Sequence, residues 1–341
     1  MNTREKWIDI AKGLGLIFVL IGHTKLYICA SVVYIFHMPL FFFLSGYVFS
    51  GEKHDAKDFI KKKLVSLMLP YYVLGLLVLL ANTLLNMYYV DFRMKYLMRI
   101  TDEKYKIITY ITGERFGTLW YIATLFWLNI LLLILIKIFK SNYKIIAVAV
   151  ITMAVIAFVY YGLGGGALYM NIDACFAMMP FYYAGYMANK CGIFHKEYFV
   201  KHSKKWLIGS ILVGAIAGAV NFVYMGGHVD IYFNNYGLIP VMFIGSFAGI
   251  VAIICISFKL KSRFLEYIGC NSMLIYALHQ ATIFTLGEVV MYEYNKMWEH
   301  NMFLKITESI VCIILSLVIF GLLTVVIKKH KFAVIFGLKQ G

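Results

Sequence analysis

The sequence predicts an all-α polytopic membrane protein with about ten transmembrane helices and with both termini in the cytoplasm. Three observations predict this fold class: the composition, the length of the apolar runs and the distribution of basic residues. The 341 residues are 62% hydrophobic and 14% charged, with a mean hydropathy of +0.79, whereas soluble domains are roughly 45–50% apolar and about 25% charged. The excess apolar surface must face lipid, and no polar stretch is long enough for a soluble domain. We therefore expect one integral-membrane domain, 1–341.

Runs of about 20 mostly apolar residues, enough for a helix to cross a bilayer, recur along the chain. Backbone groups in lipid must be satisfied within the segment, and these runs do not alternate as barrel strands do, so we expect helices. The expected helices are 7–27, 31–50, 64–86, 117–138, 145–162, 172–189, 206–224, 237–258, 270–290 and 303–327. The longest polar stretch, Leu85–Gly117, is expected to be an outer loop, and Gly164–Gly166 a short outer turn.

Basic residues are concentrated in alternate loops. One set of loops, together with the two termini, carries more than twice as many lysines and arginines as the other set. Because basic residues collect on the cytoplasmic side, this set is predicted to be cytoplasmic. Topology then accounts for most of the net charge of +15, and we expect no nucleic-acid partner. The six cysteines are scattered without a C-x-x-C or Cys/His cluster, so we expect reduced thiols and no metal.

The first helix carries three ionisable residues, which are costly inside a membrane and are therefore candidates for function. They are Asp9, Lys12 and His23. At 100° per residue Lys12 lies about 60° and His23 about 40° from Asp9, and His23 is about 16 Å beyond Lys12 along the axis. They form a polar line on one helix face. The alternatives are an interfacial ion pair for Asp9 and Lys12 and a helix-packing hydrogen bond for His23.

The second helix places another histidine at a similar depth. It begins at Phe36-His37-Met38-Pro39 and runs in the opposite direction, so His37 is expected in the outer half beside His23. Two histidines at one depth on consecutive helices are able to share a site. Ser45, later in the same helix, is either a substrate contact or a helix-packing residue.

Further polar and aromatic residues are expected near this depth. Arg115 precedes the fourth helix on the outer side, and Trp120 lies in the first turn of that helix, as a substrate contact or as an aromatic-belt anchor. Tyr276 and His279 lie in the ninth helix, where a buried structural histidine is an equal alternative. On the cytoplasmic side, Lys61, Lys62 and Lys63 precede the third helix. They are either topology signals or a phosphate clamp.

At these residues the sequence resembles the acyltransferase 3 family of membrane O-acyltransferases, and more closely its fucose 4-O-acetylase-like branch. The stretches that carry the resemblance are Arg4–His23, Phe36–Tyr47, Lys62–Tyr71, Gly117–Phe126 and Asn271–His279. The first two are specific in combination, and the others are weak alone. Together with ten helices the likeness covers nearly the whole chain.

The resemblance implies transfer of an acyl group, usually acetyl from cytoplasmic acetyl-CoA, to a hydroxyl of an envelope glycan or its lipid-linked precursor. It implies that His23 is the catalytic base or acyl carrier. It also implies that Lys12 stands where many members have arginine. The family often has two arginines three residues apart before the third helix, whereas this sequence has lysines.

The expected mechanism places the phosphates of CoA at Lys12 and the Lys61–Lys63 cluster, with the pantetheine arm along the polar line to His23. Asp9 and His37 are expected to assist the catalysis, and Arg115 or Trp120 to orient the acceptor. The alternative is a transporter or flippase for a lipid-linked glycan, although no duplicated halves or broken-helix pairs are evident. We expect a multi-pass protein of the plasma membrane whose partners are the lipid bilayer, acyl-CoA and the glycan acceptor. A homo-oligomer is compatible with the sequence.

Overall fold

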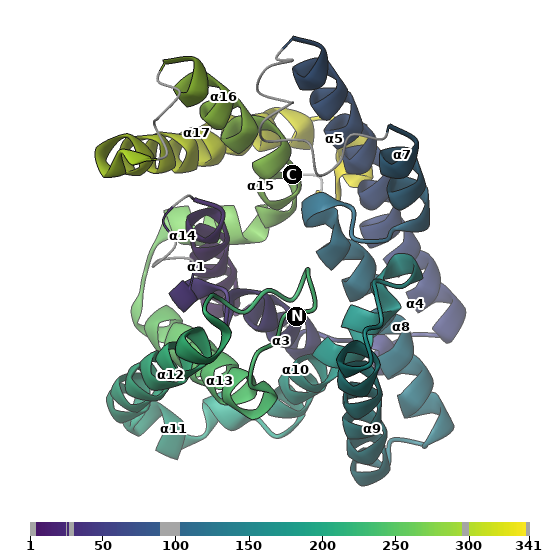
Figure 1. The fold of residues 1–341 in the computed structure, drawn as a ribbon. Coiled ribbons are helices and arrows are strands. Elements are labelled where there is room, and N and C mark those ends of the chain that lie inside the picture. Colours follow the sequence, from purple (N-terminus) through teal and green to yellow (C-terminus); the bar gives the residue numbers. More distant parts are fainter. Residues whose placement is uncertain (1–4, 25, 27–30, 89–102, 295–299, 339–341) are drawn as a thin grey trace.

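The computed structural model describes residues 5–24, 26, 31–88, 103–294 and 300–338 (Figure 1). In this part of the chain, one isolated bridge between Asp230 and Asn235 is the only β-type pairing. The α-helices are α1 (Lys6–Gly22), α3 (His37–Tyr47), α4 (Ala56–Lys63), α5 (Leu69–Tyr88), α7 (Glu103–Thr112), α8 (Trp120–Ile138), α9 (Tyr143–Gly162), α10 (Ile172–Lys190), α11 (Glu197–Lys201), α12 (Ser203–Met225), α13 (Ile239–Lys259), α14 (Arg263–Cys270), α15 (Ser272–Leu278), α16 (Thr285–Tyr294) and α17 (Met302–Lys328).

The predicted all-α membrane fold is confirmed. Every predicted spanning segment contains helix, and within the described residues eight helices are long and apolar enough to cross a membrane. The segments of α1 and α10 are not among those eight, because α1 has 17 residues and α10 contains Asp173, Pro180 and Lys190. Most residues of both helices are buried, and the surrounding helices shield them (Figure 1). A helix shielded from lipid does not need to be apolar on every face.

Glycines allow the central helices to pack backbone against backbone. A Cβ added to Gly269 of α14 would lie 1.8 Å from the carbonyl oxygen of Asp9 in α1. A Cβ added to Gly46 of α3 would lie 1.8 Å from the carbonyl oxygen of Tyr182 in α10. Small residues at helix interfaces permit this close approach in membranes. These contacts fix α1 and α3, the two helices that carry the predicted histidines.

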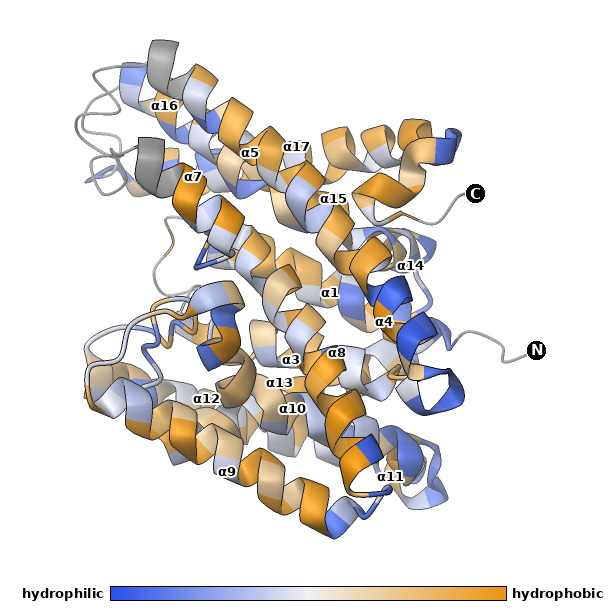
Figure 2. Ribbon diagram, turned by 90° about the vertical axis from the view of Figure 1, so that its right-hand side faces the viewer, coloured by the Kyte–Doolittle hydropathy of each residue, from blue (hydrophilic) through white to orange (hydrophobic). Residues whose placement is uncertain are grey.

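The apolar surface and the charged ends are arranged as a membrane protein requires. Hydrophobic residues run along the outer surfaces of α5, α7 and α9, whereas hydrophilic residues gather at α4 and α11 (Figure 2). Both termini lie on the side of α4 and α11 (Figure 2). The protein therefore has one side that carries both termini and an opposite side that carries neither. That the side with the termini faces the cytoplasm stays a prediction, as does the single domain 1–341.

Three local features differ from the sequence prediction. The expected outer loop Leu85–Gly117 is wrong where α7 lies, and residues 89–102 are outside the described part. In α7, Tyr110 donates a hydrogen bond to the carbonyl of Tyr72 at 2.7 Å, and Tyr71 donates one to the carbonyl of Tyr110 at 3.1 Å. These bonds hold α7 against α5. The charged first residues of α7 made the segment resemble a loop in the sequence, although its second half is apolar. Short helices α4 and α14 were not expected, and 270–290 divides into α15, a π-helical turn and α16.

Candidate active site

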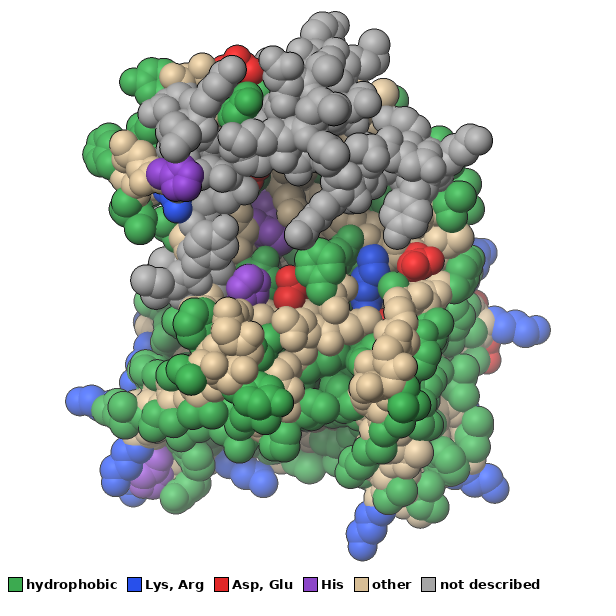
Figure 3. All heavy atoms as spheres, viewed as in Figure 1, with side chains coloured by type: hydrophobic (Ala, Val, Ile, Leu, Met, Phe, Trp, Pro, Cys, Tyr) green, Lys and Arg blue, Asp and Glu red, His purple; other side chains and the backbone are tan. Residues whose placement is uncertain are grey.

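A cavity of about 810 Å³ lies on the side opposite the termini and is called the histidine cavity here. Figure 3 looks at this side, where histidine, acidic and basic side chains gather at a recess in a largely apolar surround. His23, Tyr34, His37, Tyr276 and Gln280 are part of its wall. They come from the end of α1, from α3 and the turn before it, and from α15 and the turn after it. Helices far apart in sequence therefore converge on one space.

The structure brings the two predicted histidines together. His23 caps the end of α1, and its backbone N–H donates to the carbonyl of Val19 at 3.2 Å. His37 is the first residue of α3 and is only 4% exposed. Its Nδ1 lies 2.9 Å from the carbonyl oxygen of Val33. A carbonyl only accepts, so this bond places the proton of a neutral His37 on Nδ1 and leaves a lone pair on Nε2. His37 can therefore accept a proton or a hydrogen bond at Nε2.

The opposite wall is built around Arg115, in the turn between α7 and α8. Its Nη2 lies 2.7 Å from Oδ2 of Asp173, with side-chain exposures of 9% and 0%. Arg115 also donates to the side chains of Asn171 and Asn234, and its guanidinium lies over the ring of Trp120 at 5.8 Å from the centroid. The charge of Arg115 is thus fixed and largely cancelled by its buried partner.

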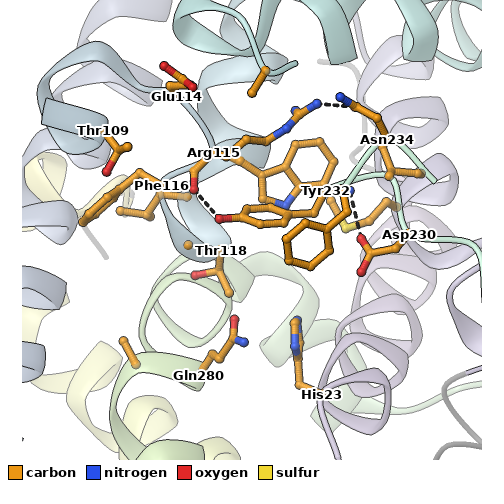
Figure 4. A pocket seen from close by; sticks show the side chains of 18 of the residues that line it. His23, Thr109, Glu114, Arg115, Phe116, Thr118, Asp230, Tyr232, Asn234 and Gln280 are labelled. Carbon is orange, nitrogen blue, oxygen red and sulfur yellow. Dashed lines mark hydrogen bonds between the residues drawn. The ribbon is translucent and has the colours of Figure 1, made fainter. Parts of the chain in front are cut away.

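The loop between α12 and α13 covers this wall. The hydroxyl of Tyr232 donates to the carbonyl of Arg115, and the amide of Tyr232 donates to Oδ1 of Asp230 at 3.0 Å. Figure 4 shows His23 and Gln280 reaching into the cavity from one side and Tyr232 with Arg115 from the other. Burial raises the pKa of Asp230 above its ordinary value, although the charge of His228 and backbone hydrogen bonds act in the opposite direction. The carboxyl of Asp230 thus lines the histidine cavity beside the ring of Tyr232.

Two of the predicted substrate-binding residues, Ser45 and His279, lie outside the wall of the histidine cavity. His279 is fully buried and lies against His23, with ring centroids 5.0 Å apart, but it is not one of the residues that form the cavity wall. Ser45 lies between α3 and α8, where its Oγ is 3.3 Å from the hydroxyl of Tyr121. Trp120 and Tyr276 form part of the wall, as expected.

A second cavity of about 480 Å³ lies at the other end of α1 and is called the lysine cavity here. Its wall includes Asp9 and Lys12 of α1, Lys328 at the end of α17 and Cys270 at the end of α14. Lys12 and Lys328 are half-buried and Cys270 is exposed. The predicted polar line of α1 therefore has a cavity at each end.

The cluster Lys61–Lys63 forms the last turn of α4, close to this end of α1. Lys61 and Lys62 are exposed, whereas Lys63 is half-buried. The positive charges of Lys62 and Lys12 both act on Lys63. These lysines are not part of the wall of the lysine cavity. They add positive charge near it.

Sequence reasoning missed a large part of the histidine cavity. Tyr34, Asp230, Tyr232 and Asn234 line it, and so does Gly164–Gly166, which was expected to be only a turn. Loop residues have no helical periodicity to show which way they face. One signal was present, because the short segment 228–235 between two apolar helices contains a histidine, an aspartate and two asparagines.

The arrangement is suited to proton transfer from a hydroxyl. Two imidazoles and four tyrosines stand around a largely apolar space beside hydrogen-bonding amides and hydroxyls, which is the usual composition of a small-molecule site. Within the described residues, no group of three or more His, Cys, Asp and Glu side chains could hold a metal ion.

Comparison with known proteins gives two matches. Residues 5–326 match the acyltransferase 3 family, whose description is an acyltransferase domain. The chain is 24% identical over 344 residues to nodulation protein NolL of Mesorhizobium japonicum, covering 91% of this chain and 83% of that protein. No solved structure matches the chain.

Proposed function

Because the chain belongs to the acyltransferase 3 family and is a multi-pass membrane O-acyltransferase, we propose that it transfers acetyl from cytoplasmic acetyl-CoA to a hydroxyl of an envelope glycan or its lipid-linked precursor. The plasma membrane is the membrane in which cytoplasmic donor and envelope acceptor meet. One observation carries the proposal: α1 has the histidine cavity at one end and the lysine cavity at the other.

The lysine cavity supports a phosphate-bearing donor. Lys12 and Lys328 reach it from two helices, and lysine binds phosphate well as a point charge. Eleven residues of helix separate Lys12 from His23, which is about 16 Å at 1.5 Å per residue. The pantetheine arm has about thirteen bonds between phosphate and sulfur, and an extended chain advances about 1.2 Å per bond, which gives about 16 Å. An arm of this length reaches from one cavity to the other.

The histidine cavity supports an uncharged part of the acceptor. Trp120, Tyr34 and Tyr232 offer flat apolar faces, while Thr118 and Gln280 offer polar groups for hydroxyls. Because Asp173 cancels the charge of Arg115, the remaining carboxylates of Glu114 and Asp230 make the wall acidic. This wall best fits an acceptor whose sugar inside the cavity has neither a carboxylate nor a phosphate.

In the proposed reaction, His23 takes the proton of the acceptor hydroxyl while its oxygen attacks the thioester carbonyl. The new C–O ester bond forms, the C–S bond breaks, and the proton passes from His23 to the thiolate of CoA. In the covalent version, a C–N bond to His23 forms as the C–S bond breaks and the CoA thiolate leaves; the acceptor oxygen then attacks the acyl-imidazole, the C–N bond breaks, and the hydroxyl proton passes to the thiolate. His37 is placed to accept a hydrogen bond from the acceptor, and Asp9 to orient Lys12.

The test is transfer of radiolabelled acetyl from acetyl-CoA to glycan extract by the purified protein in lipid. His23→Ala is expected to reduce label in the glycan by about 100-fold or more, which is the usual contribution of a general base. Ser45→Ala is the matched control, since Ser45 is a polar residue of a neighbouring helix outside the cavity. Wild-type transfer with full activity in His23→Ala would overturn the role of His23. If wild type neither binds nor consumes acetyl-CoA, the donor is wrong.

A further inference from the structure

His279 occupies an unusual position next to His23. It follows the last residue of α15, is fully buried, and lies with its ring centroid 5.0 Å from that of His23. Its Nδ1 lies 3.1 Å from the carbonyl oxygen of Ile275 and 2.9 Å from that of Tyr276. The buried imidazole is therefore held in place by its own helix.

These contacts determine which nitrogen of His279 carries the proton. Both carbonyls only accept hydrogen bonds, so a neutral ring has its proton on Nδ1 and a lone pair on Nε2. Nε2 is buried and has no hydrogen-bond partner in the described part of the chain. A buried acceptor without a donor is unfavourable, and such groups in folded proteins call for a reason such as a role in function. The adjacent imidazole of His23 carries a ring N–H, which is the kind of donor that Nε2 of His279 lacks.

The helix changes its geometry directly after His279. Residues Gln280–Phe284 form a π-helical turn, and the amide of Phe284 donates to the carbonyl of His279 at 3.0 Å. Such turns occur frequently at functional sites. Here Gln280 is part of the cavity wall while His279 is buried against His23. At the start of this turn, two consecutive residues therefore have different neighbours: His279 contacts His23, and Gln280 lines the histidine cavity.

We propose that His279 is a positioning residue that accepts the ring N–H of His23 at its Nε2. This bond fixes His23 in one tautomer and orientation, with the lone pair of its other nitrogen toward the acceptor hydroxyl. When His23 takes the hydroxyl proton, its two N–H groups face the acceptor oxygen and His279, and no proton needs to move to His279. The proposal rests on His23 being the catalytic base.

Two isosteric substitutions test this role against a purely structural one. In His279→Gln the side-chain amide reaches the place of Nε2, whereas in His279→Asn it reaches only the place of Nδ1. We expect His279→Gln to keep kcat within about 10-fold of wild type and His279→Asn to lose about 100-fold, with KM for acetyl-CoA unchanged. If His279 only ties its own helix together, the order is reversed, and that result or equal activities would overturn the proposal.

A second measurement reads the tautomers in the wild type and does not depend on the activity of the variants. Solid-state ¹⁵N spectra of the histidine-labelled wild type in lipid report which ring nitrogen is protonated, with His23→Ala and His279→Gln used to assign the signals. A single tautomer at His23 and Nδ1–H at His279 are expected. A mixture of tautomers at His23 would overturn the proposal. Full activity of His23→Ala would instead overturn the role of His23 itself, so the two failures are distinguishable.

Discussion

The two cavities at the ends of α1 hold their charged groups in different ways. In the histidine cavity, Arg115 is bonded to Asp173 and Asn234, and His37 is bonded to a backbone carbonyl. In the lysine cavity, Lys12 of α1 and Lys328 at the end of α17 are half-buried. Fixed groups can orient one hydroxyl for reaction, whereas a lysine ammonium acts as a point charge that holds phosphate without a strict geometry. This difference fits the proposed roles, in which the histidine cavity carries out the chemistry and the lysine cavity binds the donor.

The largest expected effect comes from breaking the fixed network. Arg115→Gln leaves the carboxylate of Asp173 buried without its cation, because the exposure of that carboxylate is 0%. Removing one partner of a buried pair costs about 3–5 kcal/mol of stability. Denaturant unfolding in detergent micelles measures this, with Lys137→Gln, an exposed cation in the last turn of α8, as the control. Equal stability of the two variants would show that the network is not what holds this wall.

The helices and the meeting of His23 with His37 could be predicted from the sequence because both rest on periodicity and hydropathy. A helix fixes the direction of its side chains, so an ionisable residue inside an apolar run can be assigned a depth and a face. The lysine cavity was predicted in part, since Lys12 was identified but Lys328 was not. Lys328 sits in a basic run at the end of the last helix, where topology signals and ligands have the same sequence appearance.

The loops that complete the histidine cavity could not be predicted in the same way. Asp230 and Tyr232 reach the site through hydrogen bonds to each other and to Arg115, which is more than a hundred residues away in sequence. Helix α7 was also missed because its charged first turn resembles a loop. His279 was identified, but its placement against His23 depends on the π-helical turn, which hydropathy does not reveal.

The next largest effect tests the lysine cavity. Lys12→Gln and Lys328→Gln are each expected to raise KM for acetyl-CoA about 10-fold, the equivalent of about 1.4 kcal/mol, and to leave kcat nearly unchanged. The reason is the loss of one charge-assisted contact to a phosphate. With S-acetyl-pantetheine, which has no phosphate, these variants should match wild type. Lys196→Gln, an exposed lysine elsewhere, is the control. A fall in kcat with both donors would place these lysines in the chemistry instead.

A smaller effect is expected at the acidic wall of the histidine cavity. Asp230→Asn keeps the acceptor of the Tyr232 amide but removes the charge, so KM for an acceptor sugar with a carboxylate should fall about 2–5-fold, and KM for a neutral sugar should not change. Because burial raises the pKa of Asp230, wild type loses this charge at a higher pH than an ordinary aspartate as the pH falls. Its rejection of the anionic sugar should therefore weaken on acidification, whereas that of the variant stays constant. Equal pH profiles would contradict the role of Asp230.

The smallest expected effect separates the two cavities by their response to salt. Salt screens partly exposed charges over a distance of about 10 Å at 0.1 M and about 3 Å at 1 M. The half-buried lysines should therefore hold the donor less well, with KM for acetyl-CoA rising about two- to threefold between low and high salt. The histidine cavity offers hydrogen-bonding groups and aromatic faces around a fixed ion pair, so KM for a neutral acceptor should not change. The Lys12→Gln, Lys328→Gln double variant should lose the salt dependence of the donor. If the acceptor KM rises with salt as steeply as the donor KM, both cavities attract by charge and the division between them does not hold.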